Sequence, residues 1–223
     1  MYYKRVGGVG MGLDVDNHLD AVKRTVSFLK YDGRPAAAVA IARRYPTTAA
    51  DLWLAVTDSE RIPRWFMPIS GDLKLGGRYQ LQGNASGLIT ACEQASHFAL
   101  TWEFGGDVSW VEVRCAADKA EGAWLTLTHT SHLSEHWDKY GPGAVGVGWE
   151  LAFMGLALYL ATPTKPKLDE ATFVASTEGR TLIAGSSAGW ERAAIAAGAD
   201  PDAARTAAIR TTAFYTGEAV GAT

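Results

Sequence analysis

Hydrophobic and polar residues alternate with a period of two through the middle of the chain, from Gly71 to Thr130. This alternation is typical of strands that bury one face. It predicts strands separated by turns at Gly83–Gly87, Gly105–Asp107 and 119–122, with a first strand containing Leu73 and Leu75 that ends at Gly76-Gly77. In the clearest strand four large side chains share one face: Phe98, Leu100, Trp102 and Phe104. The pattern therefore predicts an antiparallel meander.

A hairpin and a short helix precede the meander. Two apolar runs, Ala21–Leu29 and Ala36–Ile41, flank Asp32-Gly33, a dipeptide that favours a tight hairpin turn. Pro46 ends the second run. Thr47 or Thr48 can then cap a helix, whose buried face is marked by a spacing of three and four residues: Leu52, Trp53 and Val56.

A long apolar helix is predicted from about Val145 to Leu160. It carries two apolar stripes and so needs two partners. The sheet can cover one stripe. Two further helices, about 180–197 and 201–215, are predicted to cover the other, unless a second subunit in a homodimer does so. The side chains expected to make this contact are Trp190, Ile195, Ile209 and Phe214.

The composition is that of a globular protein, and the length suits one large domain or one domain with an accessory segment. The 223 residues are 48% hydrophobic and 20% charged, with a formal net charge of −3. This charge gives no basic surface for nucleic acid. Cys92 and Cys115 are expected to be buried thiols in a reducing cytoplasm rather than a disulfide. The N-terminus lacks the apolar core of a secretory signal and is expected to be a flexible leader, residues 1–18.

The run from Ala144 to Ala161 approaches the length of a membrane span. Four glycines at or next to its start and within it, together with an internal acid, Glu150, favour a helix buried between two layers of protein instead. Glu150 itself is expected to be exposed near the start of this helix, where the helix dipole favours a carboxylate. The alternative is a buried carboxylate paired with an Arg or Lys of the C-terminal tail. No membrane span is predicted.

The order hairpin, helix, antiparallel strands and long helix resembles the START-like (SRPBCC) superfamily. More narrowly, it resembles the subfamily named for the activator of heat-shock protein 90 ATPase. The matching segments are Ala50-Asp51-Leu52-Trp53, Thr57-Asp58, Trp65-Phe66, Gly76-Gly77, Gly87, Leu100-Thr101-Trp102-Glu103, Leu125-Thr126-Leu127-Thr128-His129 and Gly148-Trp149.

This resemblance implies an α+β helix-grip fold, in which a curved antiparallel sheet wraps around a long C-terminal helix with a cavity between them. The expected divisions are the leader, a START-like domain at 19–162 and a helical extension at 163–223 that packs on the domain or on a partner subunit. Relatives bind lipids, polyketides and other apolar small molecules in this cavity, and some are cyclases or dehydratases. No cofactor is predicted.

An apolar or aromatic small molecule is accordingly the predicted ligand. The residues expected to bind it are Trp65, Phe66, Trp102, Leu127, His129, Trp149, Phe153 and Met154, although each could also be plain core packing. The alternative function is a protein-interaction or chaperone-ATPase-regulating module without a ligand. Trp110 and Trp124 are out of phase with the inward residues, so they are expected on the convex face, where such a partner could bind.

His129 is the candidate catalytic residue, because it is in phase with Leu125 and Leu127 and should point inward. An imidazole there could act as a general base on a ligand. The alternative is a core histidine that a backbone group satisfies. His132 and His136 raise the question of a metal site with His129, but a Gly/Pro loop follows closely, and no metal is predicted.

Overall fold

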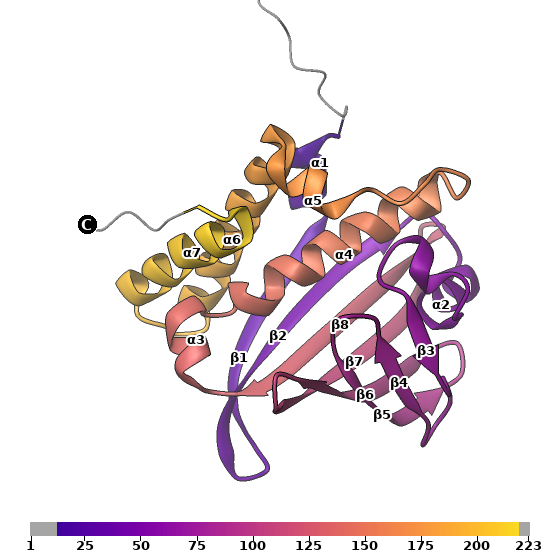
Figure 1. Ribbon diagram of the computed structural model, residues 1–223, viewed down its shortest axis with the longest axis horizontal. Helices are drawn as coiled ribbons and strands as arrows, with labels where there is room; N and C mark the ends of the chain where they lie inside the picture. The colour runs from indigo at the N-terminus through magenta and orange to yellow at the C-terminus, as the bar shows by residue number, and fades with distance from the viewer. Residues whose placement is uncertain (1–12, 219–223) are drawn as a thin grey trace, which may run out of the picture.

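An eight-stranded antiparallel sheet curves around one long helix, α4 (Figure 1). The computed structural model describes residues 13–218. The strand order is β1-β2-β8-β7-β6-β5-β4-β3. The strands are β1 Val22–Tyr31, β2 Arg34–Tyr45, β3 Ile69–Gly71, β4 Arg78–Leu81, β5 Ser86–Glu93, β6 His97–Phe104, β7 Asp107–Asp118 and β8 Gly122–His132.

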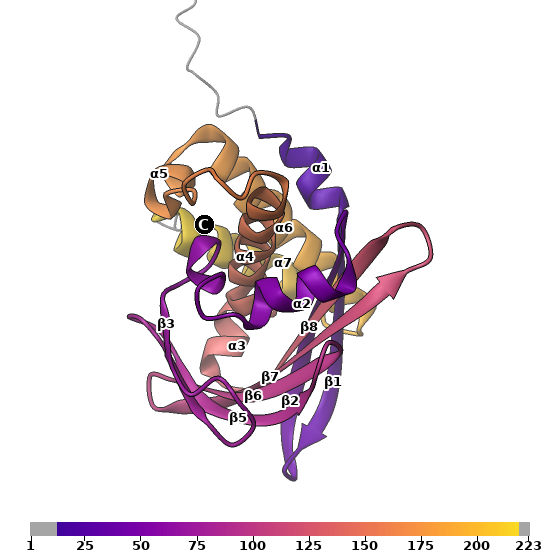
Figure 2. The same ribbon diagram turned by 90° about the vertical axis from the view of Figure 1, so that its right-hand side faces the viewer.

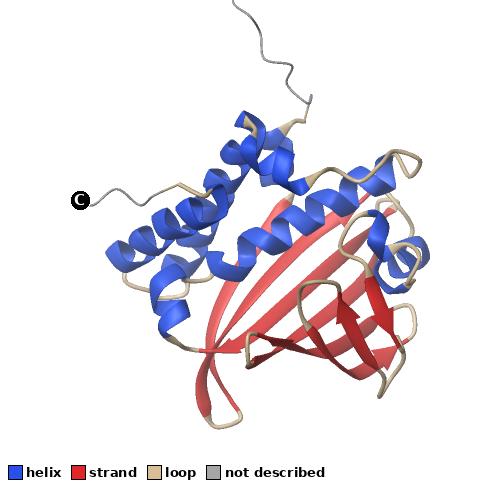
Figure 3. Cartoon of the chain, viewed as in Figure 1, coloured by secondary structure: helices blue, strands red, loops and turns tan. Residues whose placement is uncertain are grey.

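The helices gather on the concave side and at one end of the sheet (Figure 3). They are α1 Val15–Asp20, α2 Ala49–Thr57, the 3-10 helix η1 Ile62–Arg64, α3 Glu135–Tyr140, α4 Gly143–Ala161, α5 Glu170–Ala175, α6 Thr177–Ala196 and α7 Pro201–Thr216. The α+β helix-grip fold predicted from the sequence is confirmed.

The N-terminal hairpin and the helix after it form as local sequence rules predict. Asp32 and Gly33 both have positive φ, 47° and 77°, which matches the tight turn that joins twisted strands. β2 ends at Tyr45, directly before Pro46. The Thr48 hydroxyl accepts a hydrogen bond from the Asp51 amide and so caps α2.

The predicted strand through Leu73 and Leu75 is wrong. Residues 72–77 form a tight loop, in which the Gly77 amide donates to the Lys74 carbonyl and the Asp72 amide to the Arg78 carbonyl. Gly76 has φ 78°, and a Cβ on Gly77 would lie 2.0 Å from the Asp72 oxygen. The glycine pair therefore folds the chain back on itself before a strand can form there, and β3 lies earlier, at Ile69–Gly71.

Helix α4 is packed from two sides, as its two apolar stripes indicate. On the sheet side, the buried Tyr45 hydroxyl of β2 donates to the Phe153 carbonyl at 3.0 Å. On the other side, α6 lies against α4 and β1 (Figure 2). The buried Trp190 of α6 fits over Gly146, where an added Cβ would come within 2.3 Å of the indole ring. By length and composition α4, with 19 residues and a mean hydropathy of 1.6, could also cross a membrane, a test that core helices pass as well.

The expected exposure of Glu150 is wrong. Its side chain is 4% exposed, and both carboxylate oxygens accept from the Arg24 guanidinium at 2.7 Å. Arg24 lies on β1, which is an edge strand of the sheet, so the ion pair attaches α4 to that edge. A buried carboxylate requires such a partner, because desolvating an unpaired charge is costly.

Two of the four side chains expected to cover α4 from the extension do not do so. Ile209 and Phe214 are 56% and 60% exposed, whereas Trp190 is 1% exposed. Helix α7 packs mainly on α6 and contacts α4 less, so some of its apolar side chains lie outside the interface with α4.

Two smaller expectations also need correction or bounds, and a third agrees with the structure. Residues 1–12 of the predicted flexible leader lie outside the described residues, but Val15–Asp20 form helix α1, capped by the Asp14 carboxylate. Cys115 is buried as expected, whereas Cys92 is exposed. Trp110 and Trp124 alternate with the buried residues of their strands and so lie on the outer face.

Candidate functional site

An inner cavity of about 400 Å³ lies between the concave face of the sheet, α2, the η1 segment and α4. Inward residues of β4 to β8 form its floor, including Ile89, Val111 and Leu127. Its lining is predominantly apolar and aromatic, which is typical of a small-ligand site.

Four rings stand side by side in the wall of this cavity, and we call them the aromatic panel: Trp65, Phe66, Trp149 and Trp102. Trp65 and Phe66 stack with ring centroids 5.4 Å apart, and Phe66 and Trp149 with centroids 5.9 Å apart. Trp102 meets Trp149 edge to face at 5.1 Å. Trp65 is fixed because its indole donates to the Ala55 carbonyl of α2 at 2.9 Å. The panel thus joins η1, β6 and α4.

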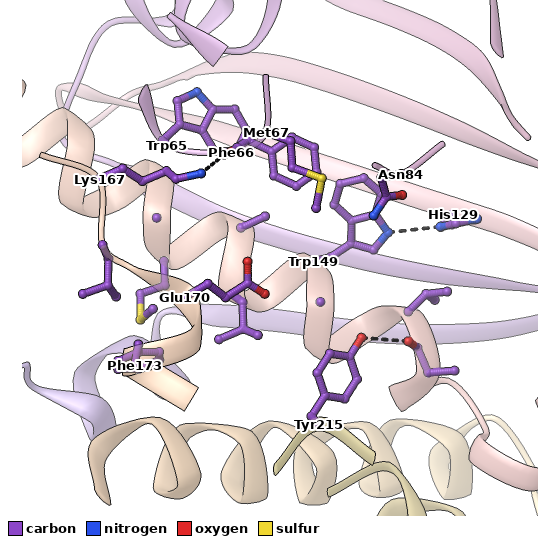
Figure 4. Close-up of a pocket in the computed structure, with 18 of the residues that line it drawn as sticks. Trp65, Phe66, Met67, Asn84, His129, Trp149, Lys167, Glu170, Phe173 and Tyr215 are labelled. Atoms are coloured by element: carbon purple, nitrogen blue, oxygen red, sulfur yellow. Dashed lines mark hydrogen bonds between the residues drawn. The ribbon is translucent and has the colours of Figure 1, made fainter. Parts of the chain in front are cut away.

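His129 is buried behind the panel and is hydrogen-bonded at both ring nitrogens. The Trp149 indole N–H donates to His129 Nδ1 at 3.1 Å (Figure 4), and His129 Nε2 lies 2.8 Å from Ser109 Oγ. An indole N–H can only donate, so Nδ1 must accept and the ring proton must sit on Nε2. Nε2 therefore donates to Ser109, whose hydroxyl donates in turn to the Trp102 carbonyl at 3.3 Å.

This arrangement has the opposite polarity to a catalytic Ser–His pair. There the imidazole accepts the serine proton, and a third group accepts from the other ring nitrogen. Here burial lowers the pKa of His129 to about 4, so the ring is neutral, and its one lone pair is bound to Trp149. The geometry makes His129 a fixed link between β7, β8 and α4.

A second space, the outer groove, lies on the other side of the panel and has a volume of about 370 Å³. The extension forms one of its walls, through Lys167, Glu170, Phe173 and Tyr215, while the panel forms another (Figure 4). The Tyr215 hydroxyl donates to the Ala144 carbonyl at 2.9 Å and so attaches α7 to the start of α4. Lys167 Nζ donates to the Phe66 carbonyl and attaches the extension to the panel.

The residues predicted to bind the ligand fall into three groups. Trp65, Phe66, Trp102 and Trp149 border both spaces. Leu127 and Phe153 border the inner cavity alone. His129 and Met154 border the outer groove, and Met154 packs beneath the extension with Phe173 and Leu182.

Sequence analysis missed lining residues of two kinds. Trp53 and Phe98 face the inner cavity and had visible signals, since each lies on the buried face of its predicted element. Lys167, Glu170 and Tyr215 of the outer groove gave no signal, because the loop and helices that carry them show no pattern that places them against the domain.

The other histidines do not join His129. His132 is out of phase with it on β8 and stacks edge to face with Trp110 of the outer face, at 5.2 Å. His136 is exposed on the six-residue helix α3. Within residues 13–218, no three His, Cys, Asp or Glu side chains are arranged to hold a metal ion.

Comparison with known proteins assigns the chain to a family. Residues 46–161, just over half of the chain, match the family described as Activator of Hsp90 ATPase homolog 1-like protein. The chain belongs to this family. The matched segment runs from the end of β2 to the end of α4, so the groove wall that α5 and α7 supply lies outside it. No curated protein matches the chain in sequence.

Solved structures agree with this assignment. The solution structure of CalU16 from Micromonospora echinospora is 29% identical, with a TM-score of 0.66, and covers 79% of this chain and 97% of its own. A crystal structure of CalU16 is 33% identical over 64% of this chain and 88% of its own, with a TM-score of 0.57. DynU16, described as a putative protein in the dynemicin biosynthetic locus, is 24% identical over 59% of this chain and 50% of its own, with a TM-score of 0.51, and shares the fold.

Proposed function

We propose that the protein binds a neutral, apolar and at least partly aromatic small molecule in the inner cavity. The observation that carries this proposal is a partly open space of about 400 Å³, bordered by aromatic rings, between the concave face of the sheet and α4. A core that serves packing alone is filled to near-crystalline density, because voids lose dispersion contacts. A space of this size is large enough for a molecule of two or three fused rings.

The hydrogen-bonding groups of the lining support a neutral ligand. Thr57, Tyr79 and Trp65 donate to backbone carbonyls, so their protons are already bound. The indole N–H groups of Trp53 and Trp102 have no partner within the described residues and could each donate to one ligand oxygen. A charged group placed here would lose its hydration without gaining a counter-ion, which disfavours acids and amines.

The affinity expected from apolar burial is modest. Removal of roughly 300 Å² of ligand apolar surface from water contributes about 7 kcal/mol, at about 25 cal/mol per Å². That is equivalent to a dissociation constant of about 10 μM before the entropy lost on binding is counted. Binding should therefore be sought at micromolar probe concentrations.

The test uses N-phenyl-1-naphthylamine, a neutral fluorescent probe, and two neighbouring substitutions on β5. Ile89 faces the cavity and Leu88 the outside, so Ile89→Phe fills the space while Leu88→Phe adds the same ring on the other face. We expect saturable binding to the wild-type protein, at least tenfold weaker binding to Ile89→Phe, and no change for Leu88→Phe. Absence of saturable binding, or equal effects of the two substitutions, would contradict the proposal.

The catalytic role predicted for His129 is a separate matter. Its lone pair is bound to the Trp149 indole, so His129 could act on a ligand only after Trp149 moved away. We propose instead that His129 positions Trp149 in the wall of the cavity. If an identified ligand is converted by the wild-type protein, His129→Gln should retain the conversion, whereas loss of conversion with unchanged binding would restore the catalytic role.

The alternative function as a protein-interaction module receives no support from the outer-face tryptophans. Trp110 is covered by the Tyr31 ring at 4.1 Å, and the Lys23 ammonium lies over Trp124 at 4.3 Å. Each ring is therefore already in contact with a neighbour on its own sheet, and the two do not form one bare apolar surface.

A further inference from the structure

The outer groove and the inner cavity share one partition. Both spaces are bordered by the four rings of the aromatic panel and by Ala152 of α4. A ligand that fills the inner cavity must therefore lie against the panel, and any substituent directed past the panel enters the outer groove. The chemistry of the groove then decides which substituents are accepted.

Three polar side chains in the outer groove have unused hydrogen-bonding capacity. Asn84 Oδ1 accepts from the Ala85 amide at 2.7 Å, while its NH₂ group has no partner within residues 13–218. The Glu170 carboxylate likewise has no hydrogen bond or ion pair with another described residue. Lys167 uses one proton for the Phe66 carbonyl and has two left. The groove thus offers a charged donor and a charged acceptor together, whereas no charged side chain is among the residues that line the inner cavity.

The charges of the groove limit the substituent further. Lys167 and Glu170 carry opposite charges, so the groove as a whole favours neither an anion nor a cation. A neutral group that both donates and accepts, such as a set of hydroxyls or an amide, can use all three side chains. A ring that carries such hydroxyls can also lie flat on the rings of the panel, since its C–H faces are apolar.

We propose that the outer groove is a second subsite of the same ligand site, and that it binds a neutral, hydroxyl- or amide-bearing substituent of the molecule whose apolar body occupies the inner cavity. This proposal rests on the proposed function of the inner cavity. Lys167 and Glu170 come from the extension beyond the family match at 46–161, so the subsite is a property of the extension rather than of the family domain.

The test compares two probes that differ only in such a substituent: 1-naphthol and 1-naphthyl β-D-glucoside, each displacing N-phenyl-1-naphthylamine. Glu170→Ala removes the acceptor of the groove. Its matched control is Asp202→Ala, which removes an exposed acid from the first turn of another extension helix, α7, outside the groove. Both positions are exposed, so neither substitution should impair folding.

We expect Glu170→Ala to weaken binding of the glucoside about tenfold, in line with the loss of a hydrogen bond to a charged acceptor, and to leave naphthol within about twofold. Asp202→Ala should leave both probes unchanged. Equal effects of Glu170→Ala on the two probes, no effect on either, or failure of the glucoside to bind would each overturn the subsite. The inner cavity is judged separately, since Ile89→Phe should weaken naphthol whether or not the subsite exists.

Discussion

Acid should destabilise the protein through His129. The ring is 4% exposed, and burial lowers its pKa from 6.5 to about 4. The unfolded chain therefore takes up a proton at this residue as the pH falls below about 6.5, while the folded protein resists protonation until about pH 4. The unfolding free energy therefore contains the full contribution of the neutral His129 above pH 6.5, and this contribution is lost as the pH falls towards 4. A difference of about 2.5 units corresponds to roughly 3 kcal/mol of unfolding free energy.

His129→Gln isolates this contribution. The glutamine amide can accept from the Trp149 indole and donate to Ser109, as the imidazole does, but it does not titrate. His18, whose pKa is also lowered to about 4, mainly by burial, remains in both proteins and adds the same acid sensitivity to each. The matched control is His136→Gln, at an exposed position on α3.

The assay is urea unfolding followed by circular dichroism, in steps of half a pH unit from pH 7 to pH 4. The free energy of unfolding of the wild-type protein should fall relative to His129→Gln, by about 3 kcal/mol over the whole range. The His136→Gln curve should follow the wild-type curve. Parallel curves for the wild-type protein and His129→Gln would refute the reasoning, because they would mean that His129 binds its proton equally in the folded and unfolded states.

Three further substitutions test the packing of α4 by urea unfolding at pH 7. Arg24→Met should lower the unfolding free energy by about 3–5 kcal/mol because it leaves Glu150 buried and unpaired. Adding Glu150→Met should restore most of the lost free energy. A double variant whose loss equals the sum of the two single losses would contradict this reasoning. Gly146→Ala should cost about 1–3 kcal/mol, since its Cβ would lie 2.3 Å from Trp190, and Trp190→Leu in the same chain should make the alanine tolerable. Tyr45→Phe should cost about 0.5–1.5 kcal/mol because it removes the bond from β2 to the Phe153 carbonyl, which keeps its partner within α4; an unchanged value would show that this bond does not stabilise the fold.

The elements that the sequence predicted are those whose shape depends on neighbouring residues. The Asp32-Gly33 turn, the cap of α2 and the alternation of β6 each follow from steric or hydrogen-bonding rules over a few positions. The wrong strand at Leu73 and Leu75 arose from the same rules. Two alternating residues satisfy a period of two, but the contact of Gly77 with the Asp72 backbone decides the conformation.

The site needed information that local patterns do not contain. The inward direction of His129 followed from its phase on β8, but its partners did not. Ser109 reaches it only because β7 and β8 pair Val111 with His129, which places Ser109 diagonally beside the ring on the same face. Likewise, Glu150 finds Arg24 126 positions earlier in the chain. Such pairs depend on strand register and helix placement, which one sequence does not specify.

Two indole rings of the aromatic panel are anchored by hydrogen bonds, and these anchors differ in strength. Trp149 is held by one bond to a neutral imidazole, and a bond of this kind contributes about 1 kcal/mol net. Burial of a two-ring ligand contributes several times as much. Trp65 is less free, because its indole is tied to α2 and its carbonyl packs against Gly155 of α4, where a Cβ would lie 2.7 Å away. Of these two rings Trp149 therefore has the weaker anchor, so a ligand that displaces a ring of the panel should move Trp149 rather than Trp65 and η1.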